Sequence, residues 1–152
     1  MIRKTVHLIN TILLAAVLLT IGSCDRHGVT WEKLDMAESL MDSKPDSAFV
    51  VLGSIPASKV KGKEVAARYA LLKSMALDKN CIDTTTFDIL QPAIDYYIKH
   101  GTPDEQLRTY YYQGRIYQNQ GDDDSAMCSF MNGSDLGAVS YTHLRAHETG
   151  RN

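Results

Sequence analysis

The sequence predicts an all-α protein built from helix hairpins. After residue 30, apolar side chains recur at intervals of three and four residues in six stretches, a spacing that puts them on one face of a helix. Short segments rich in Pro, Gly, Asp and Ser separate these stretches. No stretch alternates apolar and polar residues for long enough to indicate a strand. The composition, 22% charged and 44% hydrophobic, is that of an ordinary globular domain.

The first two helices form the first predicted hairpin. The apolar stripe of the first helix ends near Asp42, and its members are Trp31, Leu34, Ala37, Leu40 and Met41. Pro45 then falls in the first turn of the second helix, where a missing N–H has no cost. The apolar residues of that second helix are Ala48, Val51, Leu52 and Ile55.

The second hairpin is predicted from residues 64–77 and a fourth helix that follows the polar segment 78–86. Thr85 or Thr86 is expected to cap the fourth helix, and Pro92 either kinks it or marks where regular helix begins. His100 followed by glycine indicates its end. Its apolar residues are Ile89, Leu90, Ala93, Ile94, Tyr97 and Ile98.

The third hairpin carries the clearest boundary signals. Thr102 and Glu105 have the spacing of a capping box, with a proline between them in the first turn. Gly121 is expected to end the fifth helix, and the acidic run 122–124 to begin the sixth, where carboxylates suit the helix dipole. The helical pattern is expected to stop at residues 137–138.

This last hairpin, TYYYQGRIYQNQGDDDSAMCSFMNGSDL, resembles a tetratricopeptide repeat. The matching positions are Tyr110, Gly114, Tyr117, Gly121, Ala126, Phe130 and Gly133. Weaker copies lie upstream, around Ala93 and Tyr97 and around Ala48 and Leu52. The resemblance implies a right-handed solenoid of about three helix pairs over residues 31–138, in which each pair covers its neighbour. Without a polar terminal helix, the C-terminal face of this array is expected to be exposed and adhesive.

The N-terminal sequence indicates a protein that is exported from the cytoplasm. Two basic residues, Arg3 and Lys4, precede an apolar run, as in a secretory signal. The run ends in Ile21-Gly22-Ser23-Cys24, which resembles the bacterial lipobox and implies lipidation of Cys24. An uncleaved N-terminal anchor is the alternative. We expect a signal peptide at 1–23, a lipidated tether at 24–30 and a location in the bacterial cell envelope, facing the periplasm or the surface.

Residues 139–152 are expected to be an artefactual tail. The stretch VSYTHLRAHET, residues 139–149, resembles the translation of a common sequencing-library adaptor. The native protein is expected to continue differently beyond residue 138. A zinc site made by His143 and His147, with Glu148 as base, is the alternative, but it lacks the HExxH order and a third ligand. No metal or cofactor is therefore predicted.

Residues 25–138 offer little material for catalysis. His100 is the one histidine inside the predicted helices, so no Ser-His-Asp or Cys-His arrangement can be assembled there. The aspartates 122–124 lack the spacing of a calcium loop. Cys81 and Cys128 are expected to be free thiols, with a disulfide as the alternative in an oxidising compartment. We therefore expect a protein that is not an enzyme.

Charge and resemblance together favour protein binding. Residues 25–138 contain 12 Lys and Arg against 17 Asp and Glu, a net charge of −5, which argues against nucleic acid as a partner. The resemblance implies a membrane-anchored scaffold whose concave groove binds a partner protein or peptide. The alternative function is the sensory ectodomain of a longer membrane-bound transcriptional or signalling regulator. A further apolar segment downstream in the uninterrupted gene would favour that alternative.

The resemblance also indicates which residues would line the groove. With Gly114 at the crossing of the two helices, one stripe of the fifth helix contains Arg108, Tyr111, Arg115 and Gln118. The weaker upstream copy adds Arg68, Leu71 and Met75. Because arginine suits carboxylates and tyrosine is favoured at interfaces, we expect an acidic or C-terminal peptide segment as the ligand. The alternative is that these are solvated helix residues, some paired with Asp or Glu.

Overall fold

The computed structural model describes the backbone of residues 28–149 and the side chains of residues 28–136. The predicted signal peptide and Cys24 lie outside the described residues. The described part of the chain is helical and contains no strand, which confirms the all-α class. Its elements are α2 (Gly28–Leu40), α3 (Pro45–Gly53), the 3-10 turn η1 (Ala57–Lys59), α4 (Lys63–Lys79), α5 (Gln91–His100), α6 (Pro103–Gln120) and α7 (Asp123–Thr149).

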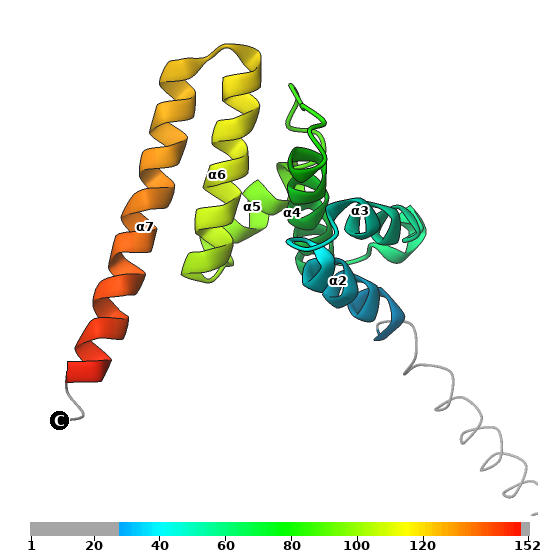
Figure 1. Cartoon of the computed structure of the whole chain (residues 1–152), viewed down its shortest axis with the longest axis horizontal. Coiled ribbons are helices and arrows are strands. Elements are labelled where there is room, and N and C mark those ends of the chain that lie inside the picture. Colours follow the sequence, from blue (N-terminus) through cyan, green and yellow to red (C-terminus); the bar gives the residue numbers. More distant parts are fainter. Residues whose placement is uncertain (1–27, 150–152) are drawn as a thin grey trace, which may run out of the picture.

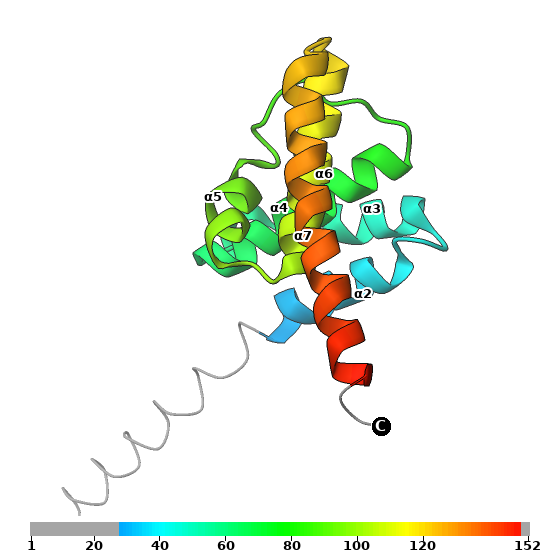
Figure 2. The same cartoon turned by 90° about the vertical axis from the view of Figure 1, so that its left-hand side faces the viewer.

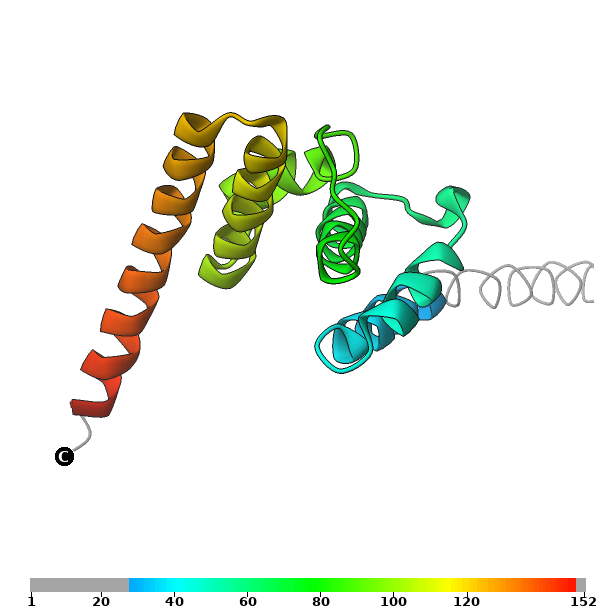
Figure 3. The same ribbon diagram turned by 45° about the horizontal axis from the view of Figure 1, so that its top comes forward.

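The helices pair in chain order, α2 with α3, α4 with α5 and α6 with α7, and each pair contacts the next. Figure 1 shows α6 and α7 at one side of the molecule, α2 and α3 at the other, and α4 and α5 between them. The same row of helices is seen from above in Figure 3. Because α4 contacts both α2 and α6, the first helices of the three pairs are neighbours.

The core is centred on α4. Nine of its residues are buried, and they lie around the helix rather than along one stripe, as expected for a helix packed on several sides. The core continues into α2 through Leu34 and Ala37, and into α6 through Tyr112 and Ile116. Burial of each large apolar side chain stabilises the fold by roughly 1.5–3 kcal/mol, so packing between pairs holds the row together.

Most of the local boundary signals are confirmed. Pro45 and Pro92 lie in the first turns of α3 and α5. Thr102 and Glu105 form the capping box at the start of α6, with the Thr102 N–H donating to Glu105 Oε2 at 2.8 Å. Gly121 ends α6 with a φ of 78°, a left-handed conformation that suits glycine. The neighbouring Asp122 accepts a hydrogen bond from the Ser125 N–H at 3.1 Å.

Three expectations differ from the structure. The helix α2 begins at Gly28, inside the predicted tether, and Thr30 is buried there at 5% exposure. No threonine caps α5, because Thr86 donates to Asp88 instead and the helix begins only at Gln91. The backbone of α7 continues to Thr149 rather than stopping at residues 137–138, because two isolated glycines and no proline interrupt the sequence of this helix.

The pair α6/α7 crosses closely at Gly114. A Cβ added at Gly114 would lie 2.5 Å from Cε1 of Phe130, so the ring of Phe130 fills the space that a side chain would need. Gly133 on α7 similarly faces the backbone of Leu107. Figure 2, viewed from the side of α7, shows this helix running in front of α6 and beyond its end. The two small residues therefore let α6 and α7 approach each other.

Candidate partner-binding surface

The predicted groove residues lie on the first helices of the second and third pairs. Arg68 is on α4, whereas Arg108, Tyr111, Arg115 and Gln118 are on α6. Tyr111 and Gln118 are exposed, and the three arginines are half-buried.

Two residues predicted to line the groove expose little surface, although Leu71 still contributes to the lining of a cleft between α2, α4 and α6. Leu71 and Met75 are buried, at 4% and 8% exposure, because α4 is covered by its neighbours α2 and α6.

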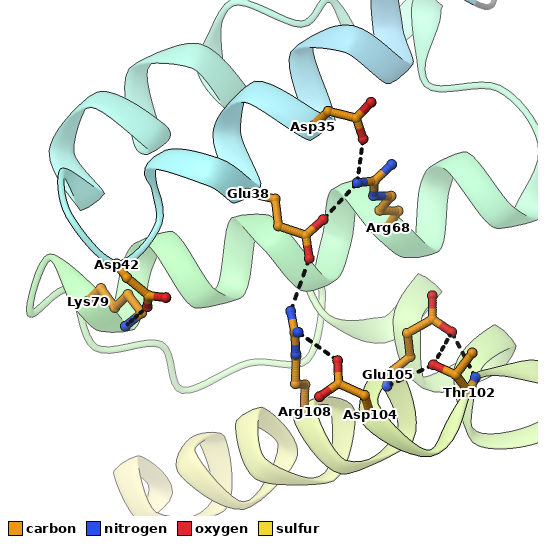
Figure 4. Close-up of polar contacts among 9 residues, drawn as sticks. All are labelled: Asp35, Glu38, Asp42, Arg68, Lys79, Thr102, Asp104, Glu105 and Arg108. Atoms are coloured by element: carbon orange, nitrogen blue, oxygen red, sulfur yellow. Dashed lines mark hydrogen bonds and ion pairs between the residues drawn. The ribbon is translucent and has the colours of Figure 1, made fainter.

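Glu38 on α2 joins three helices through two arginines. Its carboxylate accepts a hydrogen bond from Nη2 of Arg68 at 2.7 Å and another from Nη1 of Arg108 at 3.1 Å. Arg68 also pairs with Asp35 at 2.7 Å, and Arg108 with Asp104, one turn earlier on α6, at 2.6 Å. Figure 4 shows this network, with Glu38 between the two guanidinium groups. It ties the first pair directly to the third.

The network raises the pKa of both arginines. Burial of Arg68 opposes its charge, but its hydrogen bonds with Glu38 and Asp35 outweigh that effect and raise the pKa of Arg68. The pKa of Arg108 is raised in the same way, against burial, by Asp104 and Glu38. Arg68 also lies over the ring of Trp31, 5.0 Å from its centroid. Arg68 is therefore held on three sides by its own chain.

A second connection links α6 to α4 further along. Nε of Arg115 donates to Asp78 at 2.9 Å, and Nη1 of Arg115 donates to Gln118 at 2.7 Å. The hydrogen bond with Asp78 is the main cause of the raised pKa of Arg115. All three arginines are thus paired with Asp or Glu, as the alternative interpretation of the stripe expected.

The cleft between α2, α4 and α6 carries more acidic than basic groups. It has a volume of about 290 Å³. Its walls include two arginines, Arg68 and Arg108, and four carboxylates, Glu38, Glu64, Asp104 and Glu105. An acidic ligand would meet net repulsion in this cleft. The electrostatics therefore favour the second half of α6, around Arg115, for contact with a carboxylate.

Tyr111 is the exposed aromatic residue of the stripe, at 45% exposure. Its ring meets Tyr112 edge-on at 5.0 Å and lies tilted to Phe130 of α7 at 5.8 Å. Tyr112 is buried, and burial, followed by the nearby charge of Asp78, raises its pKa to about 12. Tyr111 is consequently held in place by aromatic neighbours while the rest of its side chain is exposed to solvent.

Other candidate sites can be placed as well. Cys81 and Cys128 are both free and exposed, in agreement with the sequence-based expectation. Within residues 28–136 no three His, Cys, Asp or Glu side chains are grouped as metal ligands. The side chains of His143 and His147 lie outside the described residues. None of the described helices is both long and apolar enough to cross a membrane.

The chain matches no protein-family model, no curated protein and no solved structure. Sequence reasoning missed Glu38 and Asp78, the acidic partners of the stripe. They join arginines that lie 30, 70 and 37 residues away in the chain, and no local pattern reports such pairs. Only the pair of Asp104 and Arg108, four residues apart on one helix, was readable from the sequence.

Proposed function

We propose that this protein is a non-enzymatic scaffold, a tetratricopeptide-like solenoid anchored to the cell envelope by lipidated Cys24, which binds a partner protein or peptide. One observation carries the proposal: the first helices of three successive helix pairs lie side by side and are joined by ion pairs across 70 residues of chain. Helical arrays use such extended surfaces for binding.

The proposed contact region runs along α6 from Tyr111 to Gln118. Tyr111 offers an exposed ring, and Gln118 an exposed amide. The contacts of Arg115 use Nε and Nη1, and a guanidinium has five N–H donors, so donors remain for a partner's carboxylate. A partner carboxylate binding there competes with Asp78 of the chain itself. We therefore propose an acidic or C-terminal peptide segment as the ligand of this region.

Capture of partners from a native envelope extract tests the proposal. Arg108→Ala/Arg115→Ala should lose the specific partner. The matched control, Glu38→Gln/Asp78→Asn, removes the ion pairs of Arg108 with Glu38 and of Arg115 with Asp78 from the acidic side, while both arginines stay in place, so it should keep the partner or bind it more tightly. Equal capture by wild type and both double variants, all folded by circular dichroism, would rule out this surface as the binding site. Loss in both double variants would show that the ion pairs act through the fold alone.

A further inference from the structure

The cleft between α2, α4 and α6 has the size of a site for a single side chain. Its volume is about 290 Å³, at the lower limit of ligand pockets, which span roughly 300–1,000 Å³. Trp31 of α2 and Tyr97 of α5 both line it. Tyr97 is only 3% exposed, so its ring lies at the bottom of the cleft. The cleft therefore has room for one amino acid side chain or a small molecule.

The negative charge that remains in this cleft is located on Glu64 and Glu105. The two arginines of the cleft are already paired with its other two carboxylates, those of Glu38 and Asp104. Glu64 and Glu105, in contrast, form no ion pair with a cationic side chain among the described residues. Two carboxylates of the cleft are therefore left without a cation.

These two carboxylates lie near the same side chain, Tyr97, although they come from different helices. Glu64 belongs to the first turn of α4 and Glu105 to the first turn of α6. Burial raises the pKa of Tyr97, and the charges of Glu105 and Glu64 raise it further. A helix N-terminus carries roughly half a positive charge, which is less than the full negative charge of each glutamate. A cation beside Tyr97 would therefore be attracted from both helices.

We propose that this cleft binds a primary alkylammonium group, carried by a lysine side chain of a partner or by a free aliphatic amine. An ammonium has three N–H donors, so carboxylates of two helices can share it. Its alkyl stem would pack against the apolar part of the lining, which includes Leu71 and Leu72. A planar guanidinium matches a single carboxylate better. A metal ion does not suit the cleft, because no three ligand side chains are grouped within residues 28–136.

A fluorescence titration tests the inference, because Trp31 is the only tryptophan of the chain and lines the cleft. The probes are a glycine peptide with blocked ends and one lysine, the same peptide with norleucine in place of lysine, and n-butylammonium. Each is added to the full chain in detergent solution at constant ionic strength. We expect saturable binding of the ammonium probes and none of the norleucine peptide. Tighter binding of the lysine peptide assigns the cleft to a partner protein, and tighter binding of butylammonium assigns it to a free amine.

Glu64→Gln/Glu105→Gln should weaken binding of the ammonium probes about tenfold, since it removes both charges, while glutamine preserves the capping box of α6. The matched control is Asp46→Asn/Asp124→Asn, which removes two carboxylates from the first turns of α3 and α7, outside the cleft. This control should bind as the wild type does.

Several results would overturn the inference: no saturable binding of either ammonium probe, equal binding of the norleucine peptide, or equal binding by the wild type and the cleft variant. Equal weakening in both double variants would also overturn it, because net charge alone would then explain the effect. The inference goes beyond the proposed function, since the contact region from Tyr111 to Gln118 contributes no residue to this cleft. Its failure would therefore leave the proposed function standing.

Discussion

Gly114→Ala tests the crossing of α6 and α7, on which the placement of the stripe depends. The new Cβ would lie 2.5, 2.7 and 2.9 Å from three ring carbons of Phe130, so the ring must move by roughly 1 Å to restore ordinary contact. Alanine gains about 1 kcal/mol of helix propensity over glycine, whereas overpacking costs about 1–3 kcal/mol. We expect a net loss of about 1 kcal/mol in the free energy of unfolding, measured by urea denaturation followed by circular dichroism.

The matched control is Gly53→Ala on α3, where an added Cβ meets nothing within 4 Å. Because only the helix-propensity term acts there, this variant should be as stable as the wild type or more so. Adding Phe130→Leu to Gly114→Ala should recover stability through a favourable coupling of at least about 0.5 kcal/mol. If Gly114→Ala is as stable as Gly53→Ala, the two helices do not cross at this glycine and the assignment of the stripe is wrong.

Four further predictions follow from the ion network, the buried tyrosine and the chain termini. Glu38→Gln removes two ion pairs and should lower the free energy of unfolding by about 1 kcal/mol at low salt and less at high salt. The control is Glu32→Gln, which changes an exposed carboxylate on the same helix. An equal loss of stability in both variants would count against the network. Burial raises the pKa of Tyr112 to about 12 from an ordinary value of about 10, so its contribution, on the order of 2 kcal/mol, is complete below pH ~10 and is lost as the pH rises toward about 12. Tyr112→Phe should flatten that alkaline fall, and identical pH–stability curves would refute this. The Cys24→Ser variant should be released from the membrane fraction, or its maturation should be blocked. Unchanged membrane association of this variant would disprove lipidation. The full chain should contain no bound zinc when its metal content is measured. One zinc ion per chain that is lost in the His143→Ala variant would contradict this prediction.

The helices were largely predictable because their signals are local. Thr102 and Glu105 mark the start of α6, and Gly121 marks its end. Both signals are visible in the sequence because capping and a left-handed turn depend on neighbours only a few residues away. The start of α5 was harder to predict. Apolar residues before Gln91 fit a helical pattern, yet Leu90 packs into the core from outside the helix. A residue that is buried by tertiary packing just before a helix therefore produces the same apolar spacing in the sequence as a residue inside the helix.

The candidate surface was predictable only in part. The position of Tyr111 on an open face follows from helical spacing once Gly114 is placed at the crossing. The burial of Met75 depends on how closely α2 and α6 cover α4. The pairing of Arg108 with Glu38 depends on the curvature of the whole row, which no single helix encodes. Contacts between distant parts of the chain therefore limited the prediction.

Photo-crosslinking in intact cells shows whether a partner protein lies along the second half of α6. A photoreactive amino acid replaces exposed Gln118 in one variant and exposed Val50 of α3 in another. We expect one discrete crosslinked protein from position 118, lost when Arg115→Ala is added, and none from position 50. The same adducts from both positions, or none from position 118, would contradict this expectation.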